Sequence, residues 1–194
     1  MRTKDDNKRL AIRHATVQEA IQSGLKSASV ARIAARAGVS AGTIYLYFPN
    51  KEMLLQEVYM DIKLEFHRVL MGAIVTGGAT QAGSAHNLRA MWFAMQKHLE
   101  MHANDFVFSE LVGAARLLDA AHQAQVEQLG ADIIRILQTA VADGTLCDLP
   151  LDTLRALLVS PANFLARQAA AKGVASAPAV VAQTFDAIWR AIAK

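Results

Sequence analysis

Apolar residues recur at spacings of three and four along most of the chain, which is the repeat of helices that bury one face. Gly, Pro and capping side chains interrupt this repeat at intervals and mark helix ends. The segments between the interruptions predict about nine helices, at residues 8–23, 30–37, 41–47, 51–71, 84–102, a short stretch after Asn104, 120–143, 151–171 and 178–193. Residues 72–83 are rich in Gly and predict a loop, and no segment predicts a strand. The expected fold class is therefore all-α.

Composition agrees with helices and excludes several classes of protein. Hydrophobic residues make up 53% of the chain, and only four prolines interrupt it. No apolar run reaches the roughly 18 residues of a membrane-spanning helix, so no membrane partner is expected. The polar, charged start does not resemble a secretory signal, and a single cysteine, Cys147, cannot form an internal disulfide. We therefore expect a cytoplasmic protein.

Charge is distributed unevenly along the chain. Residues 1–52 hold nine basic and four acidic side chains, a net charge of +5. The remaining residues hold eleven basic and thirteen acidic side chains, a net charge of −2. A basic N-terminal segment favours contact with a polyanion, although a solvated basic face would have the same composition.

The segment from residue 29 to residue 48 carries the strongest functional signal. Two short helices meet at Gly38-Val39-Ser40, and a helix-turn-helix needs such a tight turn between helices held at a steep angle. Small residues, Ala34 and Ala37, would let the helices approach closely. The second helix presents small or hydroxyl-bearing side chains, which suit a helix that enters a DNA groove.

The same segment resembles the N-terminal domain of the TetR family of transcriptional regulators. The matching pattern comprises Ile33-Ala34, Ala37-Gly38-Val39-Ser40, Gly42-Thr43-Ile44-Tyr45, Tyr47-Phe48 and Lys51-Glu52-Met53-Leu54. The resemblance implies a three-helix DNA-binding domain over residues 6–66 and a helical domain for effector binding and dimerisation over residues 67–194. It covers about a quarter of the chain, and the remainder shows no comparable motif.

The resemblance also assigns DNA contacts. The residues that it implies are Ser29, Arg32, Ser40, Ala41, Gly42, Thr43, Tyr45, Tyr47 and Lys51. Two positions depart from the family pattern, because Ala41 and Leu46 stand where longer polar side chains are common. Sequence choice would then depend on thymine-methyl contacts through Ala41, on Tyr45 and on DNA shape. The alternative is a plain helical hairpin in which the aromatic residues form core, and Phe48 is expected to be core in either case.

The rest of the chain offers candidates for an apolar effector pocket and a dimer interface. Met and aromatic side chains can line an adaptable pocket, although the same side chains can simply fill a core. The candidate pocket residues are Met91, Trp92, Met95, His98, Phe106, Phe108, Arg116 and Asn163. The candidate interface residues, on the last two helices, are Leu154, Leu158, Leu165, Phe185 and Trp189. The resemblance implies that these two helices pair with those of a second subunit.

The sequence therefore predicts a homodimeric repressor that a small apolar effector releases from a palindromic double-stranded DNA operator. A helical carrier or ligand-binding protein that does not bind DNA is the alternative. An enzyme is not expected, because neither a nucleophile arrangement nor the Glu-x-x-His pairs of a di-iron bundle are present. His98 and His102 lie four residues apart, but no carboxylate or cysteine cluster accompanies them, so neither a metal nor another cofactor is expected.

Overall fold

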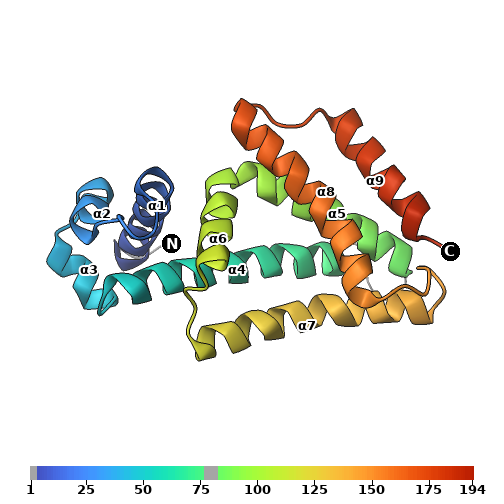
Figure 1. Ribbon diagram of the computed structural model, residues 1–194, viewed down its shortest axis with the longest axis horizontal. Coiled ribbons are helices and arrows are strands. Elements are labelled where there is room, and N and C mark those ends of the chain that lie inside the picture. The colour runs from blue at the N-terminus through green and yellow to red at the C-terminus, as the bar shows by residue number, and fades with distance from the viewer. Residues whose placement is uncertain (1–3, 77–82) are drawn as a thin grey trace. The chain divides into compact units, whose positions relative to one another are not determined.

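The computed structural model describes residues 4–76 and 83–194 of the chain. Within these residues the fold is all-α, as predicted, and an isolated bridge between Leu146 and Ala193 is the only extended pairing. Figure 1 labels the helices, which are α1 (Lys4–Ser23), α2 (Val30–Ala37), α3 (Ala41–Tyr47), α4 (Lys51–Thr76), α5 (Ser84–Met101), α6 (Ala103–Ala115), α7 (Ala120–Ala142), α8 (Leu151–Lys172) and α9 (Pro178–Ile192).

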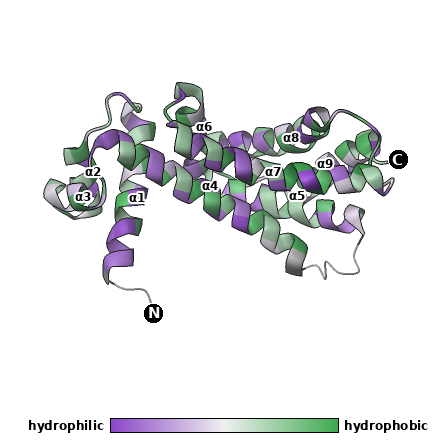
Figure 2. Cartoon of the chain, turned by 90° about the horizontal axis from the view of Figure 1, so that it is seen from below, coloured by the Kyte–Doolittle hydropathy of each residue, from purple (hydrophilic) through white to green (hydrophobic). Residues whose placement is uncertain are grey.

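Two helices are longer than the sequence pattern predicted. α1 begins at Lys4 rather than at residue 8. Asp5 and Asp6 in its first turn interact favourably with the positive end of the helix dipole and so stabilise this start. Its N-terminal turns are strongly hydrophilic (Figure 2). α4 continues past Gly72 to Thr76, so the expected loop is helical in its first part. The remainder of that loop, residues 77–82, lies outside the described residues.

Local turn chemistry explains most of the helix ends. Gly38 adopts a left-handed conformation with φ of 66°, which residues with a Cβ rarely adopt, and it ends α2. The Asn50 side chain accepts a hydrogen bond of 2.8 Å from the Met53 backbone N–H and so caps α4. Ser29, which precedes α2, makes no capping bond through its side chain. Its carbonyl oxygen instead accepts the first helical bond, from the Ile33 N–H.

The chain forms two compact units. The first comprises the residues up to Lys63 together with Asn104–Gln123, and the second comprises Leu64–Ala103 with Ala124–Lys194. This division differs from the expected boundary at residues 66 and 67, because α6 belongs to the first unit. Two contacts show why: Arg13 on α1 forms an ion pair of 2.6 Å with Asp105, and the Gln56 Nε2 donates to the Leu117 carbonyl at 2.7 Å.

The first unit surrounds a core to which α1, α2 and α3 each contribute. Ile12 on α1, Ile33 on α2 and Ile44 on α3 are all fully or almost fully buried. Phe48, directly after α3, is also buried, as the sequence predicted. These contacts hold the two short helices against α1, so the opposite face of α3 is left outside.

The second unit is built around an aromatic cluster on α5 and α9. The Trp92 indole N–H donates to the Leu158 carbonyl on α8 at 2.9 Å, and its ring lies 5.2 Å from that of Phe185. Phe93 packs against the same two rings at 5.3 Å from each. α5 therefore packs against both α8 and α9 in this unit (Figure 1). None of the helices described here is both long enough and apolar enough to cross a membrane.

Candidate nucleic-acid interface

The predicted helix-turn-helix is present, with α2 and α3 joined by Gly38, Val39 and Ser40. The Gly38 and Val39 N–H groups donate to carbonyls in the last turn of α2, at 3.3 Å and 3.0 Å. The Ser40 hydroxyl accepts from the Thr43 N–H at 3.0 Å and caps α3. Turn and cap together satisfy backbone groups at both helix ends, and so they fix the direction in which α3 leaves α2.

The outward face of α3 is almost free of polar side chains. Ile44 faces the core, and Gly42 and Leu46 lie on the opposite side of the helix, one turn apart. The Leu46 side chain is 84% exposed and Tyr45 is 52% exposed. A Cβ added at Gly42 would meet only the Ser40 Oγ, at 3.7 Å, so the helix backbone is open to close approach there.

Three hydroxyl groups at α3 already have partners within the chain. The Ser40 and Thr43 hydroxyls lie 2.9 Å apart and share a hydrogen bond. The Tyr47 hydroxyl donates to the Asp5 carboxylate on α1. The hydrogen bond to Asp5 also raises the pKa of Tyr47. These contacts orient the side chains. The Tyr47 hydroxyl can only accept further hydrogen bonds while it donates to Asp5, whereas the Ser40–Thr43 pair keeps one proton for a phosphate or a base.

The arginines of α2 are held by Glu19, a residue that sequence reasoning missed. Arg32 Nε lies 2.5 Å from Glu19 Oε1, and Arg36 Nε lies 3.2 Å from Glu19 Oε2. Arg32 also donates to the Ser27 carbonyl at 2.6 Å. The bond from Arg32 keeps the pKa of Glu19 below its ordinary value, against the opposite effect of its burial.

A sequence signal for this pairing exists in retrospect. Glu19 lies between the apolar Val17 and Ala20 on α1, which places a carboxylate on the buried side of the helix. Buried carboxylates need basic partners, and two arginines four residues apart on α2 can supply them from one helix face. Arg32, predicted to bind phosphate, therefore has a structural role, although 53% of its side chain remains exposed.

Lys51 also has intramolecular partners. Its ammonium group donates to the Lys26 carbonyl at 2.8 Å and to the Leu25 carbonyl at 3.3 Å. These bonds tie the start of α4 to the connection between α1 and α2. Because an ammonium group has three donors, one remains for a phosphate, and the predicted DNA contact stays a prediction.

The predicted effector residues are divided between the two units. Met91, Trp92, Met95, His98 and Asn163 lie in the second unit, whereas Phe106, Phe108 and Arg116 lie in the first. Met91, Trp92, Met95, Phe106 and Phe108 are buried as core, and Arg116 is exposed. Because each unit packs its aromatic side chains internally, the alternative that these residues fill the core accounts for most of this set.

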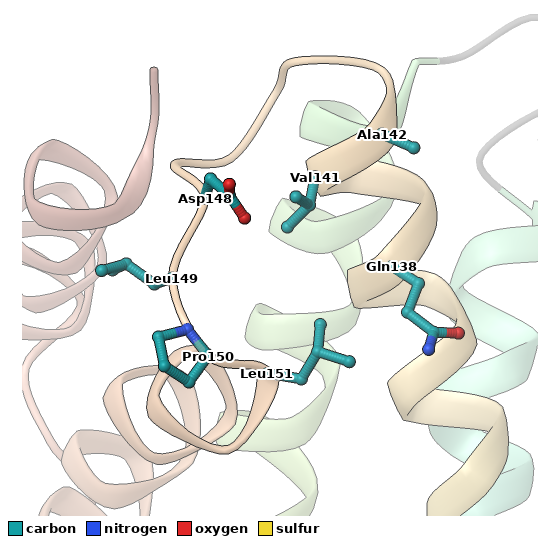
Figure 3. A pocket seen from close by; sticks show the side chains of 7 residues that line it. All are labelled: Gln138, Val141, Ala142, Asp148, Leu149, Pro150 and Leu151. Carbon is teal, nitrogen blue, oxygen red and sulfur yellow. The ribbon is translucent and has the colours of Figure 1, made fainter.

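Two other features of the second unit bear on ligand binding. Gln96 on α5 is buried and donates from its Nε2 to Glu100, but its Oε1 has no hydrogen-bond partner among the described residues. A hollow of about 500 Å³ lies where α7 leads into α8. Its lining residues are Gln138, Val141, Ala142, Asp148, Leu149, Pro150 and Leu151. Figure 3 shows Val141, Asp148 and Leu151 facing this space, whereas Leu149 points away from it.

The predicted interface residues lie largely inside the second unit. Leu154, Leu158, Leu165 and Phe185 are buried within the single chain, and Trp189 is partly buried. Other apolar side chains of α8, α9 and their connection stay outside: Leu157, Phe164, Val174 and Val180. The sequence pattern identified the amphipathic helices, and both faces of α8 carry leucine or phenylalanine. The role of the five predicted residues in a dimer interface stays a prediction.

The described residues contain no group of three or more His, Cys, Asp or Glu side chains that could hold a metal ion. The His98 and His102 rings lie 4.4 Å apart, and His98 also packs against Phe66 at 5.6 Å. The His-x-x-x-His pair is therefore explained by ring packing.

Three comparisons relate the chain to known proteins. The family model described as "Bacterial regulatory proteins, tetR family" matches residues 12–58, which include α2 and α3. The HTH-type transcriptional repressor KstR of Mycolicibacterium smegmatis is 27% identical over 137 residues, which are 71% of this chain and 64% of KstR. The chain thus matches less than two thirds of the length of that relative.

Solved structures resemble the chain over its full length. A TetR family transcription regulator from Marinobacter aquaeolei has a TM-score of 0.87 at 23% identity, with all of both chains covered, which shows the fold. A TetR-family transcriptional regulator from Haemophilus influenzae is 26% identical, with a TM-score of 0.71 and all of both chains covered. Residues 12–58 therefore match the helix-turn-helix domain of the tetR family of bacterial regulatory proteins.

Proposed function

We propose that the protein is a transcriptional regulator that binds double-stranded DNA as a homodimer and represses transcription. The observation that carries this proposal is the outward face of α3, which combines an open backbone at Gly42 with the exposed side chains of Tyr45 and Leu46. A short helix held away from the core in this way suits the major groove. The curated relative KstR is named a repressor, which supports the sign of regulation.

The proposed DNA contacts follow from the placement of the predicted residues. Ala41, Gly42, Tyr45 and Leu46 would face the base edges, because they surround the side of α3 opposite Ile44. A second set would meet the sugar-phosphate backbone: Ser29, Arg32, Ser40, Thr43, Tyr47 and Lys51. Arg32 and Lys51 have donor protons left beyond their internal bonds, whereas Tyr47 would have to release Asp5 before it could donate to a phosphate. The internal bonds of Arg32 and Lys51 reduce the side-chain entropy that these two residues lose on binding.

We place the dimer interface on the exposed apolar side of α8 and α9. Leu157, Pro161 and Phe164 lie at spacings of four and three on α8, and Val180 begins an exposed stripe of small residues on α9 that includes Ala187 and Ala191. Large exposed apolar side chains in a row are typical of a protein interface. A two-fold dimer would also present two α3 helices to a palindromic operator.

The effector in this proposal is a small, mostly apolar molecule that binds the second unit. An unpartnered Gln96 Oε1 on α5 would accept one hydrogen bond from it. α4 supplies Lys51–Lys63 to the first unit and Leu64–Thr76 to the second, so this helix is the proposed route by which binding changes the population of the DNA-competent state.

Selection of bound DNA from a random duplex pool tests the proposal. We expect a palindrome whose half-sites are separated by about 34 Å, one turn of DNA, because two copies of α3 must reach the same side of the duplex. Light scattering should give the mass of a dimer, and Phe164→Glu should yield monomer that no longer selects a palindrome. A pool without any enriched sequence would instead favour a helical carrier that does not bind DNA.

A further inference from the structure

Leu46 is unusual among the large apolar side chains of the first unit. Its 84% exposure places it in solvent at the middle of the outward face of α3. A leucine exposed to this extent does not stabilise the isolated chain. Its burial would be favourable in any complex that covers this face. A partner that offers an apolar group to Leu46 would therefore gain binding energy on this face.

The polar alternatives on α3 are few. Residues 41–47 contain no Arg, Lys, Asn, Gln, Asp or Glu, which are the side chains that read bases through paired hydrogen bonds. The Thr43 hydroxyl shares its bond with Ser40, and the Tyr47 hydroxyl donates to Asp5. The Tyr45 hydroxyl, on a half-exposed side chain, has no hydrogen bond to the residues that the structure describes.

The basic residues of α2 are also engaged. Arg32 and Arg36 on α2 both bind the buried Glu19, and the Arg36 guanidinium donates in addition to Gln22. A bidentate contact from either arginine to guanine would require these bonds to rearrange and would leave the Glu19 carboxylate buried with fewer partners. Hydrogen bonds from α2 to the bases are therefore disfavoured. Apolar contacts between α3 and the bases remain.

We propose that Leu46 is a specificity-determining residue that reads the C5-methyl group of a thymine in each half-site. This inference rests on the proposed function, since it requires that α3 enters the major groove. The thymine methyl is the apolar group that base pairs of ordinary DNA present there, whereas the other edge groups are hydrogen-bond donors or acceptors. Gly42, one turn earlier on the same face, lets the helix backbone approach closely enough for Leu46 to reach it.

The experiment replaces single thymines by deoxyuridine in the duplex selected from the random pool. Deoxyuridine keeps the Watson–Crick pairing and removes only the methyl group. We expect one thymine in each half-site at which this change weakens binding about fourfold, as expected for the loss of one buried methyl group, and about 15-fold when both half-sites are changed. Anisotropy titrations at fixed salt measure these ratios.

The variant Leu46→Ala tests whether Leu46 is the residue that senses the methyl group. It should fold normally, because the side chain is exposed, and it should bind the thymine and deoxyuridine duplexes equally. Met101→Ala removes another exposed apolar side chain, on α5, and should keep the full deoxyuridine penalty.

Three results would overturn the inference: no penalty at any thymine, a selected half-site without thymine, or the same penalty in Leu46→Ala as in the original protein. The first two would still leave DNA binding intact. A pool that yields no bound sequence would remove both the inference and the proposed function, so the two failures are distinguishable.

Discussion

Leu46 on α3 and Phe185 on α9 are both large apolar side chains on amphipathic helices, yet one is 84% exposed and the other 1%. Phe185 packs against Trp92 and stacks on Trp189 at 5.7 Å, so its contribution lies in the stability of the second unit. Leu46 has no such neighbours, because Ile44 occupies the inward face of the same short helix.

The difference shows how the two units use apolar residues. In the second unit they fill a core, and removing one creates a cavity. On α3 a core residue faces inward, and the outward apolar side chain is left for a partner. A substitution in the core of the second unit should therefore lower stability, whereas one on the outward face of α3 should change DNA binding.

The largest effect is expected for Phe185→Ala. Loss of a fully buried ring should reduce the free energy of unfolding by about 3–5 kcal/mol, measured by denaturant unfolding. The matched control is Phe164→Ala on α8, whose side chain is 60% exposed. That change should act mainly through dimerisation, so its effect should vary with protein concentration. Equal, concentration-independent losses at both positions would contradict the assignment of Phe164 to the exposed face.

Gly42→Ala should have two smaller effects, a gain in stability and a loss of DNA affinity. Because Gly42 lies in a helix and a Cβ there has room, the free energy of unfolding should rise by about 0.5–1 kcal/mol. DNA affinity should nevertheless fall about tenfold, equivalent to ~1.4 kcal/mol, since a methyl group would stand between the backbone and the bases.

Gly113→Ala is the control for that variant. Gly113 is an exposed glycine in α6 with equally open space, so the substitution should stabilise the protein without changing DNA affinity. If Gly42→Ala bound DNA as well as the original protein, the close approach of α3 to the bases would be refuted.

The smallest effect at neutral pH is expected for Glu19→Gln. The amide still accepts a hydrogen bond from an arginine, and water screens the half-exposed Arg32. The pH dependence is more telling, because the pKa of Glu19 is lowered in the folded protein. Its stabilising effect is present above the ordinary carboxyl pKa of about 4.5 and is lost as the pH falls through the lower folded value.

Thermal unfolding between about pH 2 and pH 7 tests this sign. On acidification below about pH 4.5, the melting temperature of the original protein should fall further than that of Glu19→Gln. Arg116→Gln, a change at an exposed basic residue outside the Glu19 cluster, should follow the original curve. Parallel curves for Glu19→Gln and the original protein would show that the carboxylate does not stabilise the fold.

Sequence reasoning succeeded where the signal is local. Gly38, Ser40 and Asn50 act through their own backbone or their neighbours, so the limits of α2 and α3 and the start of α4 could be predicted from residue type and spacing. It failed where an interaction joins distant residues. Nothing local indicates that Asp5 meets Tyr47, or that Asp105 meets Arg13, across 42 and 92 residues of chain.

By itself the sequence determined the helices, the helix-turn-helix and the resemblance of that segment to a family, because periodicity, capping and the ordered motif at residues 33–54 are properties of short segments. The tertiary structure decided which apolar faces are buried, that α6 belongs with the first unit, and that Glu19 holds Arg32 and Arg36. Those outcomes depend on which helices become neighbours, and a helix with apolar residues on two faces is compatible with more than one neighbour.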